Sequence, residues 1–376
     1  MYGRSDDVTQ YREAPRESEM LRLLAQGRVD TSPLTLVSVK REPIRKAQAK
    51  TLEADATIEL GWGRKAFRFA VECRAVSTPK EIAAAAETAK RGSSPPRSFP
   101  MVFVPYLTES QLRLLQEKQI SGIDLSGNAL IMVPGEILIS RTGAPNNFRR
   151  AGVIKNVYRK NSSIIPRVFL LKPRYDSITE VMDEIKSRGG IITQATISKV
   201  CNSLDQDLVI ERTKGQLPRT RSLRLIQPDK LLDLLTENYA PPPINQRLTA
   251  KTTLAPDEFC RRLAKWGRDS GTKAVLTGSS SAGQYAVMAR EPIQSFYCSS
   301  LERLLKQFGA NLEETSRFPN IEILETDEDF VYFDLRDNLA ASPVQTYLEL
   351  MQGDKREQET AEQLRKSILQ PLKKKG

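Results

Sequence analysis

The stretch RFAVECRAV (68–76) alternates apolar and polar residues and carries an acid and a base, Glu72 and Arg74, on one face. A period of two residues is typical of a β-strand with one buried face. Two similar runs precede it, LTLVSVKR (34–41) and ATIELGW (56–62), and an alanine-rich helical stretch, PKEIAAAAETAKR (79–91), follows. Strands flanked by helices predict an α/β domain over residues 16–148.

An acid and a base two residues apart on a strand is also the pattern of nucleases of the PD-(D/E)XK type. These enzymes hold a divalent metal between that acid and an Asp on a neighbouring strand. Asp55 precedes Glu72 by seventeen residues, so Asp55 and Glu72 are the candidate Mg²⁺ ligands, and Asp55, Glu72 and Arg74 the candidate catalytic residues. The base is normally lysine. Because the guanidinium of Arg74 does not deprotonate and does not replace an ammonium point charge, the arginine argues against cleavage.

Charge is unevenly distributed along the 376 residues. The whole chain has a net charge of +11, and residues 149–230 alone contain 17 basic and 8 acidic residues. A cluster of cations favours a polyanion as partner, since binding releases counterions condensed on phosphates. The chain has no histidine, and its four cysteines are scattered, which excludes Cys/His zinc fingers and Ser-His-Asp triads. No apolar run approaches the length of a spanning helix and no signal peptide opens the chain, so we expect a cytoplasmic protein without membrane contact.

The order of elements predicted over residues 149–237 is typical of a winged helix-turn-helix domain. We expect helices at RVFLLK (167–172), 177–187 and 193–207, a turn at Gly189-Gly190, and two short strands around TKGQLPRTR (213–221). In the helix at 193–207, Ile197, Val200 and Leu204 recur at helical spacing and face the core. The outward residues are candidate base readers, and the basic wing residues are candidate phosphate contacts. These DNA-binding candidates are Gln194, Thr196, Ser198, Lys199, Asn202, Arg212, Lys214, Arg219 and Arg221.

The proline-rich segment NYAPPPINQR (238–247) predicts a linker over residues 238–250, because consecutive prolines cannot continue a helix. We expect a second α/β domain over 251–371, with FVYFDL (330–335) as one of its strands and a single long helix at its end. Residues 1–15 are expected to be a flexible N-terminus and 372–376 a basic tail. Within the second α/β domain, AVLTGSSSAGQY (274–285) lacks the following carboxylate pair of a nucleotidyltransferase and the lysine of a P-loop. We interpret it as a small-residue turn that packs a helix on a sheet.

Four stretches together resemble the AbiEi-type antitoxin and transcriptional-regulator family of type IV toxin–antitoxin systems. They are EADATIEL with FRFAVECR (53–60, 67–74), YLTESQLRLLQEKQISGIDLSGNALI (106–131), ATISKVCNSLDQDLVIER (195–212) and SPVQTYLELMQGDKREQETAEQLRKSIL (342–369). The second contains the family's aspartate and glycine–asparagine segment through Asp124, Gly127 and Asn128. Arg74 departs from the family's usual Glu-x-Lys.

The resemblance implies a multidomain α/β protein that represses its own operon and opposes a nucleotidyltransferase-like toxin without necessarily touching it. The partners expected are double-stranded DNA, that toxin and a second copy of the chain, and no cofactor is expected unless the nuclease-like site is active with Mg²⁺. Two alternatives stay open: a Mg²⁺-dependent DNA nuclease targeted by its winged helix, and a protein-interaction module.

Overall fold

The computed structural model describes residues 12–41, 54–149, 155–214, 221–286, 292–335 and 339–373. The chain is a mixed α/β protein that divides into two compact units, Met1–Ile154 and Lys155–Gly376. In the parts of the chain that the structure describes, no helix is both long and apolar enough to cross a membrane.

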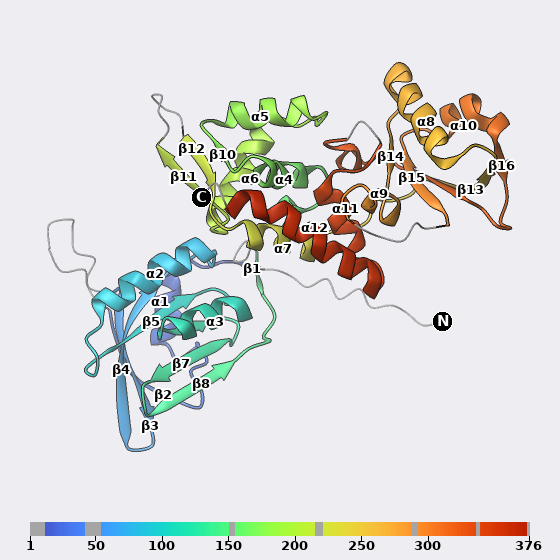
Figure 1. Cartoon of the computed structure of the whole chain (residues 1–376). Coiled ribbons are helices and arrows are strands. Elements are labelled where there is room, and N and C mark those ends of the chain that lie inside the picture. Colours follow the sequence, from blue (N-terminus) through green and yellow to red (C-terminus); the bar gives the residue numbers. More distant parts are fainter. Residues whose placement is uncertain are drawn as a thin grey trace. The chain divides into compact units, whose positions relative to one another are not determined.

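The first unit is built on a seven-stranded mixed sheet (Figure 1). Its strands lie in sequence order: β2 (Thr35–Arg41), β3 (Ala56–Trp62), β4 (Lys65–Cys73), β5 (Phe99–Val104), β6 (Ser121–Asp124), β7 (Ala129–Val133) and β8 (Ile137–Arg141). Strands β4, β5 and β6 are parallel, and the other pairings are antiparallel. A separate parallel pair joins β1 (Arg12–Glu13) to β9 (Phe148–Arg149). The carboxyl ends of β4, β5 and β6 therefore share one edge of the sheet.

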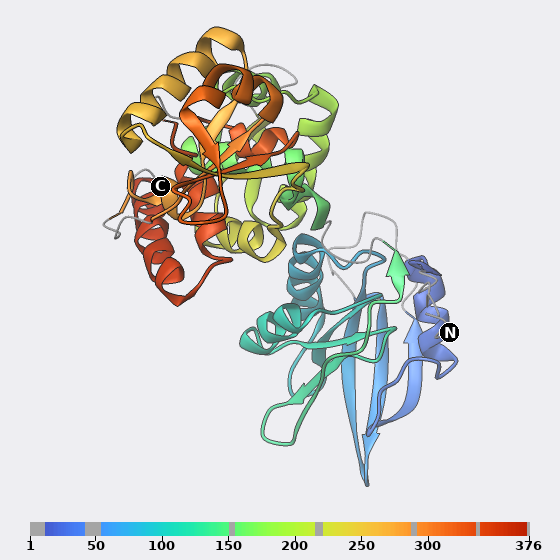
Figure 2. The same ribbon diagram turned by 90° about the vertical axis from the view of Figure 1, so that its right-hand side faces the viewer.

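Helices cover both faces of this sheet (Figure 2). Helix α1 (Glu17–Ala25) lies on one face, and α2 (Pro79–Gly92) and α3 (Glu109–Glu117) lie on the other. The apolar residues that alternate along β3 and β4 face α1, since Ile58, Phe69 and Val71 belong to the core under this helix. The core on the other face joins Ile82 and Ala85 of α2 to strand β5. Strand β5 is buried at every residue, as expected for a parallel strand between two helical layers.

The first part of the second unit contains the expected helices at the expected places. Their order is η1 (Lys155–Tyr158), η2 (Lys160–Ser163), α4 (Ile164–Leu171), β10 (Arg174–Tyr175), α5 (Ile178–Ser187), α6 (Gln194–Gln206), β11 (Ile210–Lys214), β12 (Arg221–Leu225) and α7 (Pro228–Asn238). Helices α4, α5 and α6 pack against one another. The three strands form a small antiparallel sheet in the order β10-β12-β11. The sequence prediction lacked β10, because a two-residue strand carries no periodicity, and it also lacked η1, η2 and α7.

The second part of this unit forms a five-stranded sheet in the order β14-β15-β17-β13-β16 (Figure 1). Its elements are β13 (Gln246–Thr252), α8 (Pro256–Ser270), β14 (Ala274–Leu276), α9 (Ser279–Ala282), β15 (Gln294–Cys298), α10 (Leu301–Phe308), η3 (Gly309–Asn311), β16 (Leu312–Glu314), β17 (Ile321–Glu325), η4 (Asp329–Tyr332), α11 (Pro343–Leu350) and α12 (Lys355–Lys373). Helix α12 packs back on α4 and α7, so the closing helix belongs to the same compact unit as the first three helices.

Several boundaries differ from the sequence expectation. Strand β13 begins at Gln246, inside the segment 238–250 expected as a linker, which leaves Tyr239–Asn245 between α7 and β13. The expected strand at 330–335 is wrong: it begins with the 3₁₀ turn η4, in which Phe330, Val331 and Tyr332 are all buried. A short apolar run does not distinguish a strand from a buried helical turn.

The ends of the chain also differ. The single closing helix is wrong, because α11 and α12 are separate helices interrupted around Gly353. Of the N-terminus expected to be flexible, residues 1–11 lie outside the described residues, and Arg12–Glu13 form β1. Of the expected tail, α12 continues to Lys373, and residues 374–376 lie outside the described residues.

Candidate functional site

The structure brings Asp55, Glu72 and Arg74 together at the carboxyl edge of β4. Ala56 pairs with Val71, so Asp55 lies next to Glu72 on the neighbouring strand. Nη2 of Arg74 is 2.6 Å from Oε1 of Glu72, and its Nη1 is 3.8 Å from Oδ2 of Asp55. The backbone N–H of Cys73 donates to Asp55 Oδ2 at 2.9 Å. The sequence spacing therefore predicted a true cluster.

A fourth member, Glu81, was missed by the sequence reasoning. Its Oε2 is 3.8 Å from Nε of Arg74, and it lies in the first turn of α2, capped by Thr78. Because α2 follows β4 directly, its N-terminus lies at the carboxyl edge of that strand, and this connection is the signal that could have revealed Glu81. Glu19, an acid on α1, pairs with Arg22 at 3.7 Å.

The electrostatics of this cluster are those of a buried acid held by an internal cation. Glu72 is 4% exposed, and burial, followed by the charge of Asp55, raises its pKa, which Arg74 opposes. Burial lowers the pKa of Arg74, but Glu72 and Asp55 outweigh this effect, so the net shift is upward. Among the described residues, no group of three or more His, Cys, Asp or Glu side chains is arranged to hold a metal ion. Arg74 thus places one positive charge beside the carboxylates of Glu72 and Asp55.

The segment with Asp124, Gly127 and Asn128 forms the turn between β6 and β7. Oδ1 of Asp124 accepts from the backbone N–H groups of Ser126, Gly127 and Asn128, and its Oδ2 accepts from the N–H of Leu107 and from Nδ2 of Asn128. Gly127 has φ +105°, a conformation that favours glycine. Asp124 is 1% exposed, and its oxygens are engaged within the turn. This motif organises the sheet edge.

Helix α6 presents a polar face to solvent. Gln194, Ser198, Lys199 and Asn202 are exposed, whereas Ile197, Val200 and Leu204 are buried, as the spacing predicted. Thr193 caps the helix, because its hydroxyl accepts from the N–H of Thr196 at 3.2 Å. The hydroxyls of Thr193 and Thr196 are 2.9 Å apart. Thr196 is half-buried and serves the start of the helix, unlike the four exposed residues.

The cations of the two strands that follow α6 are placed differently from one another. Nη1 of Arg212 donates to Oδ1 of Asn202 at 3.3 Å, which joins β11 to α6. Arg224 pairs with Glu211 at 2.9 Å on the opposite face of the hairpin. Lys214 pairs with Arg221 in the antiparallel backbone register, and Arg219 lies outside the described residues.

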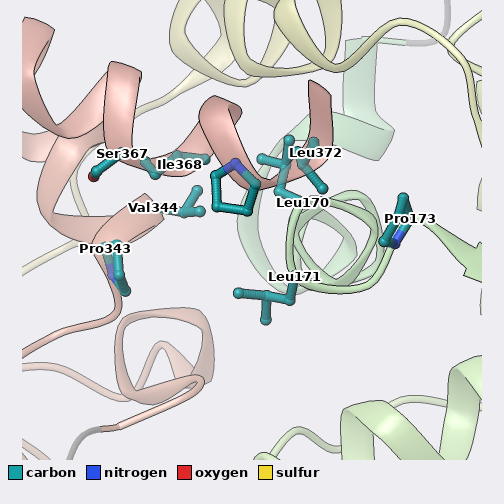
Figure 3. Close-up of a pocket in the computed structure, with 9 residues that line it drawn as sticks. Leu170, Leu171, Pro173, Pro343, Val344, Ser367, Ile368 and Leu372 are labelled. Carbon is teal, nitrogen blue, oxygen red and sulfur yellow. The ribbon is translucent and has the colours of Figure 1, made fainter. Parts of the chain in front are cut away.

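A small apolar pocket lies behind α4, between this helix and the closing helices (Figure 3). It measures about 210 Å³ and is lined by residues of α4, α11 and α12, among them Leu170, Val344 and Ile368. Three prolines, Pro173, Pro343 and Pro371, complete the wall, so hydrogen-bonding groups are scarce. The pocket marks the packing of α4 on the closing helices.

The comparisons with known proteins are negative: no family model, no curated protein and no solved structure matches the chain.

Proposed function

We propose that the protein is a sequence-specific, double-stranded-DNA-binding transcriptional regulator. The observation that carries this proposal is the exposed polar face of α6, made of Gln194, Ser198, Lys199 and Asn202. The order helix, strand, helix, helix, strand, strand from α4 to β12 supports a winged helix-turn-helix domain, in which the helix equivalent to α6 would enter the major groove. Short polar side chains allow such a close approach.

Each residue of this face has a distinct proposed role. Lys199 donates to acceptors on base edges, and guanine offers two of them, O6 and N7. The guanidinium of Arg212 has only donors, so the oxygen of the Asn202 amide must face it. The amino group of Asn202 is then directed away from Arg212 and donates to a base acceptor. Arg212, Lys214, Arg219 and Arg221 provide positive charge for the flanking phosphates.

The test is binding of the protein to DNA from upstream of its own gene, compared with random DNA. Lys199→Ala should lower affinity for the preferred site by about 1–3 kcal/mol, which is the usual contribution of one good base contact, and should affect random DNA less. Lys265→Ala, an exposed lysine on α8, is the matched control and should change neither. Equal losses on both DNAs would make Lys199 a backbone contact, and no loss on either would contradict the proposed groove.

An antitoxin role extends this proposal by analogy. The four stretches that resemble AbiEi-type antitoxins support a repressor of its own operon that opposes a nucleotidyltransferase-like toxin in the cytoplasm. Co-expression with the product of a neighbouring nucleotidyltransferase gene tests this role. Growth rescued by the intact protein supports it, and continued toxicity at full expression would leave only the regulator.

A Mg²⁺-dependent nuclease is the second candidate, because Asp55 and Glu72 lie side by side at the edge where such enzymes work. The expected result is intact DNA and RNA with Mg²⁺ or Mn²⁺, since Arg74 holds Glu72 at 2.6 Å. Metal-dependent cleavage that Glu72→Ala abolishes would establish the nuclease instead.

A further inference from the structure

A polar cavity of about 520 Å³ lies in the five-stranded part of the second unit, above the turn between β14 and α9. The turn contributes Thr277, Gly278 and Ser279, and the strands β15 and β17 contribute Ser295, Tyr297 and Glu322. The start of α12 closes one side with Asp354, Arg356 and Glu357. These segments are up to eighty residues apart in the chain, and none of the roles proposed above uses them.

Four hydrogen-bond donors that line this cavity, on Thr277, Gly278, Ser279 and Ser295, are engaged with neighbouring carboxylates. Thr277 Oγ1 donates to Glu349 Oε2 at 2.7 Å, and the N–H of Gly278 donates to the same oxygen at 2.6 Å. The hydroxyl of Ser295 donates to Glu322 Oε2 at 3.0 Å, and that of Ser279 donates to Glu357. Each carboxylate has about four lone-pair sites, so the cavity offers a ligand chiefly acceptors.

The charged groups in and around the cavity also favour a cationic ligand. The cavity is lined by the carboxylates of Glu322, Asp354 and Glu357 and by the guanidinium of Arg356. Nη1 of Arg247 lies 3.4 Å from Oε1 of Glu322, and the side chain of Arg247 is 63% exposed. Three lining carboxylates therefore face two guanidinium groups, those of Arg356 and Arg247, in a chain whose net charge is +11. This surplus of carboxylates disfavours phosphates and other anions.

We propose that this cavity binds a small organic cation that carries several N–H donors, of the chemical class of the polyamines. Its ammonium groups donate to Glu322 of β17 and to Glu357 of α12, which line the cavity from two different elements. The hydroxyls that now donate to these carboxylates keep the acceptor oxygens oriented toward the cavity.

A chain of hydrogen bonds connects the cavity to α4, the first helix of the proposed DNA-binding domain. Nε2 of Gln345 donates to Glu349 Oε1 at 2.6 Å, and Nη1 of Arg167 donates to Gln345 Oε1 at 2.7 Å. Arg167 lies on α4, is 2% exposed, and donates also to the carbonyl of Phe330 at 3.3 Å. Its Nε is buried without a hydrogen-bond partner among the described residues. A ligand bound to Glu357 reaches the turn through Ser279, whose hydroxyl donates to that carboxylate. That turn connects through Glu349 and Gln345 to Arg167 of α4, so occupancy should change DNA affinity. This second step rests on the proposed function.

The first experiment needs no DNA. Spermidine is titrated into the full-length protein by isothermal titration calorimetry, and inorganic phosphate at equal ionic strength is the anionic counterpart. We expect saturable one-to-one binding of spermidine, weakened at least tenfold by Glu322→Gln, and no binding of phosphate. Glu314→Gln, an exposed carboxylate on β16 of the same sheet, is the matched control and should leave binding unchanged. The absence of saturable binding, equal binding to both variants, or preference for phosphate would overturn the proposal.

The second experiment measures DNA affinity with and without saturating spermidine. Because spermidine also binds DNA, the comparison is between the wild type and Glu322→Gln at the same concentration. We expect at least a fivefold difference between them, within the usual range of coupling between sites. In the variant Glu349→Gln, the amide oxygen still accepts from Thr277 and Gly278, but the amide NH₂ group faces the NH₂ group of Gln345. Spermidine should therefore still bind this variant, whereas its effect on DNA affinity should be lost. Persistence of the effect would overturn the coupling. A protein that binds spermidine but no DNA would refute the proposed function and leave the cavity assignment standing.

Discussion

Replacing Arg74 with methionine should destabilise the first unit, and the loss should depend on pH. The substitution leaves Glu72, 4% exposed, without the guanidinium that lies 2.6 Å away. Breaking a buried ion pair by removing one partner usually costs about 3–5 kcal/mol. The side chain of Arg74 retains 24% exposure, so water reaches Glu72 in the variant, and we expect the lower end, about 3 kcal/mol at pH 8.

The sign of the pH dependence follows from the pKa of Glu72. Burial raises this pKa above the value of 4.5 in an unfolded chain, and Arg74 opposes the rise. Between the two pKa values the folded state binds more protons than the unfolded state, so stability falls as pH increases. Removing Arg74 raises the pKa of Glu72 in the folded state further, so the pH range over which stability is lost extends toward neutral pH. Protonation of Glu72 at pH 5 should therefore recover part of the deficit.

The assay is tryptophan fluorescence, because each unit contains one tryptophan. The chain has two tryptophans, Trp62 on β3 of the first unit and Trp266 on α8 of the second. In a Trp266→Phe background, fluorescence during urea unfolding reports on the first unit alone. The double variant Glu72→Gln, Arg74→Met should regain most of the stability, because both charges are then gone. Equal losses at pH 5 and pH 8, or a double variant no more stable than Arg74→Met, would refute the assignment of the effect to charge.

The remaining predictions concern caps, close packing and salt. Thr108→Ala removes the hydroxyl of the capping box at the start of α3 and should lower the stability of the first unit by about 1 kcal/mol in urea. Gly122→Ala places a Cβ 2.6 Å from Leu115 Cδ1 and should cost about 1–3 kcal/mol in the same assay. Leu364→Ala, on a fully buried residue of α12, should cost about 2–5 kcal/mol in the second unit, followed by Trp266. If Arg212, Lys214, Arg219 and Arg221 each neutralise one phosphate, the logarithm of DNA affinity should fall against that of salt with a slope of about −4, and a slope near −1 would exclude the wing as a phosphate contact.

The sequence predicted best those features that depend on neighbours along the chain. The alternation in 56–62 and 68–73 identified β3 and β4 and the residues that face α1. Thr108 caps α3 by accepting from the backbone N–H of Gln111, three residues later. Such signals are local, because a strand face repeats every two residues and a cap contacts the backbone three residues later.

Features that depend on the order of strands in a sheet could not be predicted. The turn at Thr277–Ser279 was interpreted as simple packing, but it lines a cavity because β17 lies next to β15 and the start of α12 folds over it. No spacing within the sequence encodes these neighbours.

The basic surplus of residues 149–230 supports a DNA-binding surface less directly than its size suggests, because several of its cations are engaged inside the protein. Arg167 is buried against an amide and a carbonyl, and Arg188 binds Asp334 and Glu184. Lys199, by contrast, lies exposed on α6 among uncharged residues that could reach base edges. Arg74 in the first unit is likewise engaged inside the protein, because its guanidinium pairs with the carboxylate of Glu72. The placement of Lys199, rather than a sum of charges, is therefore the argument for DNA, and the Lys199→Ala comparison bears on it more directly than any measure of total charge.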